Sequence, residues 1–201
     1  IRDSIMTENC GDIYGSYTWG NLTWNGAEYD EHYNVFKYTF PEFTQVNMVN
    51  PRSWAEEKDR PEWFRKDLHR AITLGSILWL GITSRLRPED SAYHDYGMMA
   101  TAFRGSLQPL LKHAQYLDDL WLENVPNQCF ASCWALENGE KLVILANDST
   151  QDVSFRMKDL HGSIVKDTKS MDTAIQDSSM IGTDPITITV PQGQLSYFVL
   201  Q

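Results

Sequence analysis

Acidic and aromatic side chains near the start of the chain are the residues best suited to chemistry. Glu8 follows a short apolar stretch, Asp12 lies four positions later, and Glu42 follows a second stretch rich in β-forming residues. Trp19 and Trp24 stand between these acids. A carboxyl group can transfer a proton to or from a reacting group, and an indole ring can stack on a flat ligand.

Each of these residues also has a purely structural interpretation. A glutamate after a strand can cap a turn or pair with a loop arginine, for which Arg52 is a candidate. The two tryptophans can pack among themselves as the core of a loop. Residue type alone leaves both interpretations open, so the elements that carry these side chains have to decide between them.

The sequence predicts no metal site and no bound cofactor. The histidines show no ligand spacing, and neither a G-x-G-x-x-G stretch nor a phosphate-binding loop is present. The G-x-S-x-G pattern of a nucleophilic serine is absent as well. The cysteines are Cys10, Cys129 and Cys133. The last two would lie roughly 13 Å apart on one face of a strand, too far for a disulfide, and are predicted to be small apolar core residues.

Composition indicates an ordinary globular chain. Of its 201 residues, 42% are hydrophobic and 22% are charged, and the net charge is −10. No cluster of lysine and arginine is present, so neither nucleic acid nor an anionic membrane surface is an expected partner. The longest apolar run, residues 72–82, is about half as long as a membrane span. Neutral or cationic small molecules are the better partners.

The first half of the chain predicts strands alternating with helices. Residues 4–7 suit a short buried strand, and residues 11–33 a long functional loop. The stretch 35–43 is β-rich and ends in Pro41 and Glu42, which predicts a second strand. Apolar residues then recur at helical spacing over residues 61–84 and 95–120, and Pro61 suits the start of the first of these helices.

The second half predicts short antiparallel strands. Two strands meet at Asn138-Gly139, a strong hairpin signal. The stretches VSFRMK, GSIVKDT, ITITVP and LSYFVLQ follow at regular spacing between turn residues. Such a series is typical of a small β-sandwich domain.

The order of these elements resembles the last part of a (β/α)8 barrel followed by a C-terminal β-sandwich. This architecture is found in the α-galactosidase-like and α-amylase-like groups of retaining glycoside hydrolases. The stretches that carry the resemblance are SIMTENCGD, VFKYTFPEF, HRAITLGSILWLG and the tail from LVILANDS to LSYFVLQ. It covers nearly the whole chain and implies a barrel portion over residues 1–124 and a β-sandwich over residues 125–201.

The resemblance also implies roles for the candidate residues. Active sites of this fold lie at the carboxyl ends of the strands, and glycoside hydrolysis uses two carboxyl groups. Glu8 is then the general acid/base, while Asp12 and Glu42 bind substrate and Trp19 and Trp24 stack on sugar rings. In the α-galactosidase-like group the nucleophile lies on an earlier strand, so its counterpart would precede Ile1 and this chain would carry half of the catalytic pair.

Two alternatives stay open at this stage. The chain could be a carbohydrate-binding or interaction protein that has the fold without the chemistry. It could also assemble a barrel from two copies, because paired half-barrels would cover open sheet edges. The expected partners are therefore a neutral carbohydrate and either an N-terminal fragment of the same parent protein or a second copy. The parent protein could be secreted or periplasmic, which the sequence leaves open.

Overall fold

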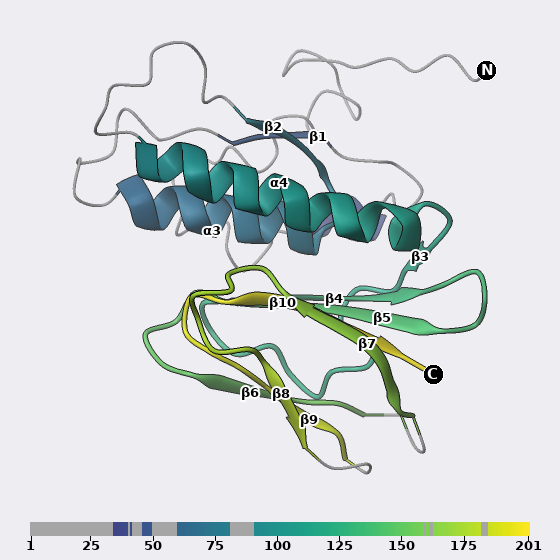
Figure 1. Ribbon diagram of the computed structural model, residues 1–201. Helices are drawn as coiled ribbons and strands as arrows, with labels where there is room; N and C mark the ends of the chain where they lie inside the picture. The colour runs from purple at the N-terminus through teal and green to yellow at the C-terminus, as the bar shows by residue number, and fades with distance from the viewer. Residues whose placement is uncertain are drawn as a thin grey trace, which may run out of the picture. The chain divides into compact units, whose positions relative to one another are not determined.

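The protein is described here from a computed structural model of the chain. The structure describes residues 34–39, 41, 46–49, 60–80, 91–158, 160, 163–181 and 185–201. The chain divides into two compact units, Ile1–Thr101 and Ala102–Gln201. Figure 1 shows helices with a short parallel sheet in the first unit and antiparallel strands in the second.

The described part of the first unit alternates helix and strand. Its elements are α2 (Val35–Thr39), β1 (Val46–Val49), α3 (Arg60–Thr73), β2 (Ile77–Leu80) and the start of α4 (Ser91–Leu111). Strands β1 and β2 are parallel, with Val46 opposite Ile77 and Val49 opposite Leu80. Helix α3 is therefore the crossover of a β-α-β unit, the connection that parallel neighbours require.

Helix α3 confirms the predicted apolar stripe but ends earlier than expected. Phe64, Leu68 and Ile72 on this stripe are buried. The predicted helix 61–84 was wrong beyond Thr73, because Gly75 adopts a φ of 69°. The Gly75 N–H donates to the Ile72 carbonyl and the Ser76 N–H to the Ala71 carbonyl. These two bonds form a Schellman cap, after which the chain turns into β2.

The strand predicted over residues 35–43 was also wrong, because α2 occupies its first half. The Tyr38 N–H donates to the Asn34 carbonyl at 2.7 Å, and the Lys37 Nζ donates to the Pro41 carbonyl at 2.8 Å. Lys37 is buried, which holds the end of this short helix in place. Both contacts join residues four apart in the chain, and strand propensity is a weak preference that they override.

A helix was predicted over residues 95–120. Helix α4 begins earlier, at Ser91, and also ends earlier, at Leu111. Its buried side includes Phe103 and Leu107, as the apolar spacing predicted. Pro109 lies in its last turn, and Leu111 is its final residue. Met98, in the first half of the helix, is 55% exposed.

The second unit contains two antiparallel sheets. The strands are β3 (Gln115–Tyr116), β4 (Cys129–Ala135), β5 (Lys141–Asn147), β6 (Val153–Arg156), β7 (Val165–Ser170), β8 (Ser179–Ile181), β9 (Thr187–Val190) and β10 (Leu195–Leu200). One sheet has the order β3-β4-β5-β10-β7 and the other the order β6-β9-β8. The predicted hairpin is confirmed: β4 and β5 pair antiparallel and are joined through Gly139, whose φ is 84°.

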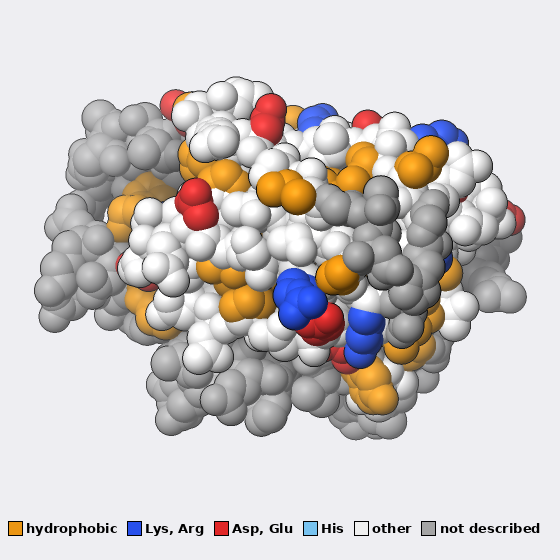
Figure 2. Space-filling view, turned by 90° about the horizontal axis from the view of Figure 1, so that it is seen from below, with side chains coloured by type: hydrophobic (Ala, Val, Ile, Leu, Met, Phe, Trp, Pro, Cys, Tyr) orange, Lys and Arg blue, Asp and Glu red, His pale blue; other side chains and the backbone are white. Residues whose placement is uncertain are grey.

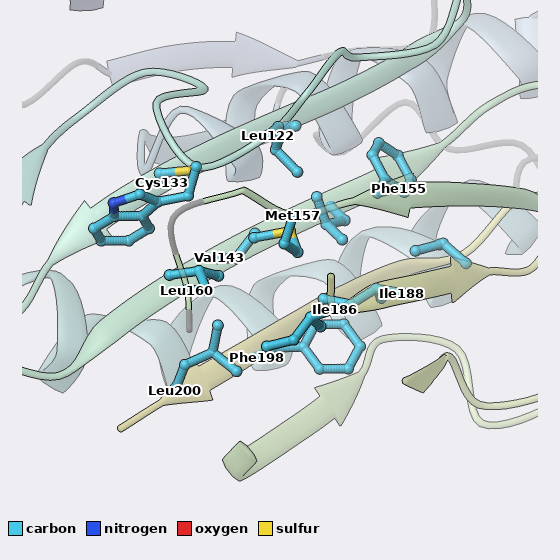
Figure 3. Close-up of a cluster of buried hydrophobic side chains, with 14 of the residues drawn as sticks. Leu122, Cys133, Val143, Phe155, Met157, Leu160, Ile186, Ile188, Phe198 and Leu200 are labelled. Atoms are coloured by element: carbon cyan, nitrogen blue, oxygen red, sulfur yellow. The ribbon is translucent and has the colours of Figure 1, made fainter. Parts of the chain in front are cut away.

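The two sheets share one hydrophobic core, which Figure 3 shows in close-up. Val143 and Phe198 come from the five-stranded sheet, and Phe155 and Ile188 from the three-stranded sheet. All four are at most 2% exposed. Successive side chains of a strand point to opposite faces of its sheet, which places alternate residues of each strand between the two sheets. Strands β5 and β10 of the five-stranded sheet are buried along almost their whole length.

The outer side of the three-stranded sheet is largely polar, although Ile181 of β8 is 69% exposed there. Ser154 and Arg156 of β6 are exposed, and the Ser154 hydroxyl lies 3.0 Å from that of Thr189 on β9. Figure 2 views the molecule from below, the side on which Figure 1 draws β6, β8 and β9. Hydrophobic side chains form separate patches there. No helix in the described part of the chain is both long and apolar enough to cross a membrane.

Candidate functional site

The five residues predicted for the site lie outside the described residues. They are Glu8, Asp12, Trp19, Trp24 and Glu42. Their roles therefore stay predictions. What the structure does describe is the pair of parallel strands in the first unit, the edge of which can be followed residue by residue.

Strands β1 and β2 end at the same edge of their sheet. They are parallel and in register, so their last residues, Val49 and Leu80, lie opposite each other. In sheets of parallel strands, ligands bind outside the carboxyl ends of the strands. The candidate site is therefore the carboxyl edge formed by Val49 and Leu80. The segments that follow it, residues 50–59 and 81–90, lie outside the described residues.

The structure removes the original reason for placing Glu42 at such an edge. The prediction rested on a strand ending at Glu42, but residues Val35–Thr39 form helix α2 and the next strand begins at Val46. Glu42 itself lies outside the described residues. By contrast, the predicted strand before Glu8 lies outside the described residues.

Asn47 of β1 is a buried polar side chain that the sequence analysis missed. It is 3% exposed, and neither atom of its side-chain amide has a hydrogen-bond partner among the described residues. A buried polar group in this state costs free energy. The apolar residues around Asn47 in V-N-M-V are the sequence signal of the strand that carries it.

Polar side chains of α3 are held inside the first unit by partners. The Arg70 Nη2 donates to the Asp67 Oδ1 at 2.7 Å, and both side chains are almost fully buried. The His69 Nε2 lies 2.7 Å from the Tyr96 hydroxyl, which joins α3 to α4. Ion pairs and hydrogen bonds of this kind satisfy buried groups, so we assign these residues to structure.

The described cysteines are unsuited to nucleophilic or metal chemistry. Cys129 and Cys133 are free and buried, as predicted. Burial raises the pKa of each thiol to about 12, so both stay protonated at neutral pH. A thiol has to lose its proton to act as nucleophile or ligand. Among the described residues, no three His, Cys, Asp or Glu side chains come together as a metal site.

The second unit contains an open hollow of about 290 Å³. It lies between the last turn of α4 and the turn that joins β4 to β5. Its lining residues are Pro109, Leu110, His113, Leu136, Glu137 and Asn138. Nothing in the spacing of these residues pointed to a shared surface, because the two segments are far apart in the chain.

Comparison with known proteins gives likeness of fold. No family model and no curated protein matches the sequence. Among solved structures, Amy13B of Eubacterium rectale matches with a TM-score of 0.50 and 14% identity, over 97% of this chain and 46% of that chain. At this identity the match shows that the two chains share a fold.

Two further solved structures match at lower TM-scores. The catalytic domain of GH30 xylanase C from Talaromyces cellulolyticus has a TM-score of 0.45 and 10% identity, over 80% of this chain and 42% of that chain. The Nostoc punctiforme debranching enzyme in its native form has a TM-score of 0.46 and 13% identity, over 77% of this chain and 35% of that chain. The chain spans less than half the length of each of the three structures.

Proposed function

We propose that this chain is the C-terminal part of a retaining glycoside hydrolase that acts on a neutral oligosaccharide or glycoconjugate. The observation that carries the proposal is the fold shared with Amy13B along 97% of the chain. The parallel β1-α3-β2 unit, followed by two antiparallel sheets, supports the same architecture. In this proposal residues 1–124 belong to a (β/α)8 barrel and residues 125–201 form a β-sandwich.

The proposed chemistry assigns one catalytic group to this chain. Glu8 gives a proton to the leaving oxygen of the glycosidic bond and later takes one from water. Asp12 and Glu42 bind substrate hydroxyl groups, and Trp19 and Trp24 stack on sugar rings. The nucleophilic carboxylate stands on a segment that precedes Ile1 in the parent protein. A general acid of this kind has to hold its proton near neutral pH, which apolar and aromatic surroundings favour.

An external nucleophile provides a direct test of this assignment. We would give the chain an aryl glycoside and sodium azide, which attacks the anomeric carbon while the aryl alcohol leaves with a proton. Wild-type chain should form the glycosyl azide from a substrate with a poor leaving group. Glu8→Gln should lower that rate by about 100-fold or more, since proton transfer contributes about 10²–10⁴-fold.

The matched control is Glu62→Gln, which changes an exposed glutamate in the first turn of α3. It should leave the rate with azide unchanged. Oligosaccharide binding without any azide product, equal in wild type and Glu8→Gln, would favour the non-catalytic alternative. Absence of both binding and product would overturn the proposal.

A further inference from the structure

We propose that the hollow between α4 and the β4–β5 turn is a second carbohydrate site, which binds a single neutral hexose unit. The inference rests on the proposed function for its ligand class. Its volume of about 290 Å³ is at the lower end of small-molecule sites, which span about 300–1,000 Å³. The hollow therefore suits one sugar ring rather than an oligosaccharide.

The lining has the two kinds of surface that a sugar ring needs. Pro109, Leu110 and Leu136 provide apolar carbon atoms for the C–H face of the ring. His113 and Glu137 provide a ring nitrogen and a carboxylate for its hydroxyl groups. Among the described residues, neither of these two side chains has a hydrogen bond or ion pair that a ligand would have to break.

The Asn138 side chain is held in place by hydrogen bonds and can still form further ones. Its Nδ2 donates to the Glu140 Oε2 at 2.9 Å, and its Oδ1 accepts from the Glu140 N–H at 3.0 Å. Lys166 in turn pairs with the Glu140 carboxylate. An amide group has two N–H donors and two acceptor sites. One donor and one acceptor therefore remain, which is the pair that a hydroxyl group uses.

Both walls of the hollow are formed by backbone with regular hydrogen bonding. The Leu136 N–H donates to the Glu140 carbonyl at 2.8 Å and the Gly139 N–H to the Leu136 carbonyl at 3.0 Å, which closes the β4–β5 turn. On the opposite wall, Pro109 lies in the last turn of α4. Affinity improves when binding groups are already ordered, because less conformational entropy is lost.

Titration with methyl hexopyranosides tests the site. We would add the methyl glucoside, galactoside and mannoside separately to ¹⁵N-labelled chain and follow the backbone amides of residues 136–140. At least one hexoside should shift these amides saturably, with a Kd on the order of 1–10 mM for so small a ligand. Glu137→Ala and His113→Ala should each weaken binding by about tenfold, as expected for the loss of one hydrogen bond to a ligand.

The control is Glu123→Ala, which changes another exposed glutamate of the second unit. The Glu123 carboxylate lies 3.3 Å from the Arg156 guanidinium, and this ion pair is exposed to solvent, so its loss should change the fold little. This variant should bind the hexoside as wild type does. The inference is overturned if no hexoside shifts these amides at about 100 mM, well above the expected Kd, or if Glu137→Ala and His113→Ala bind as well as wild type. Glu8→Gln should leave this titration unchanged. The azide test of the proposed function and the titration of the hollow can therefore fail independently of each other.

Discussion

Asn147 joins the two sheets of the second unit, and its replacement by aspartate should strongly destabilise the fold. The side chain is fully buried at the end of β5. Its Nδ2 donates to the carbonyls of Gln151 and Val190, both at 2.8 Å, and Val190 belongs to the other sheet. Its Oδ1 accepts from the Ser149 N–H at 2.9 Å and from the Ser149 hydroxyl at 2.6 Å.

Asn147→Asp keeps the two acceptor contacts and removes both donors. The buried Val190 carbonyl and the partly buried Gln151 carbonyl then lose their hydrogen bonds, at roughly 1 kcal/mol each, and face a negative charge. An uncompensated buried charge raises the total to about 3–5 kcal/mol of unfolding free energy. The introduced carboxyl group would have its folded-state pKa raised by burial, so the penalty should be largest at pH 7. It should shrink as the pH falls toward the unfolded-state pKa of about 3.9.

Urea unfolding followed by tryptophan fluorescence measures this penalty at pH 7 and at pH 4.5. The matched control is Asn127→Asp, since Asn127 is exposed in the same unit and its change should stay within about 0.5 kcal/mol. Equal unfolding midpoints for the two variants at pH 7 would refute the reasoning. Asn147-Asp148-Ser149 also matches the N-x-S pattern for N-glycosylation. In the folded chain the Asn147 amide nitrogen is buried and donates both of its hydrogen bonds, so it is not accessible to modification.

Three other predictions concern the two units separately. Unfolded thiols lose their protons near pH 9, while Cys129 and Cys133 in the folded chain keep theirs to about pH 12. The free energy of unfolding should therefore fall above pH 9, by about 1 kcal/mol per thiol at pH 10. Cys133→Ala should reduce this fall in urea titrations. Gly75→Ala should lower the free energy of unfolding by about 1 kcal/mol, because Gly75 has a φ of 69°. Gly105→Ala should raise the melting temperature, because an added Cβ there meets nothing within 4 Å. Equal effects of the two changes would contradict the cap assignment. Asn47→Leu should stabilise the chain by about 1–2 kcal/mol in urea unfolding, because it removes a buried amide without a described partner, and a loss of stability would show that the amide is satisfied.

Local patterns predicted elements well where one residue type controls the geometry. Asn138-Gly139 predicted the β4–β5 hairpin because glycine permits the positive φ that the turn needs. The spacing of Phe64, Leu68 and Ile72 predicted the buried side of α3. The end of α3 was missed, although Gly75 followed by apolar residues was a usable signal of a cap.

Other features were not visible in the residue pattern. Residues 35–39 have a strand-like composition but form helix α2, in which Lys37 contacts Pro41 four residues further on. The hollow is lined both by His113, which follows α4, and by Glu137 in the turn between β4 and β5. Neither feature leaves a pattern in adjacent residues, so reading along the chain could not find it.

The sequence by itself determined the order of helices and strands in outline, the buried unreactive cysteines and the residues whose types suit carbohydrate chemistry. These depend on periodicity, turn residues and side-chain chemistry, which are local properties. Only the tertiary structure decided that β1 and β2 pair in parallel, that Asn147 joins two sheets and that Asn47 is buried. Burial and pairing depend on which distant segments meet, because the free energy of a polar group changes with the partners it finds after folding.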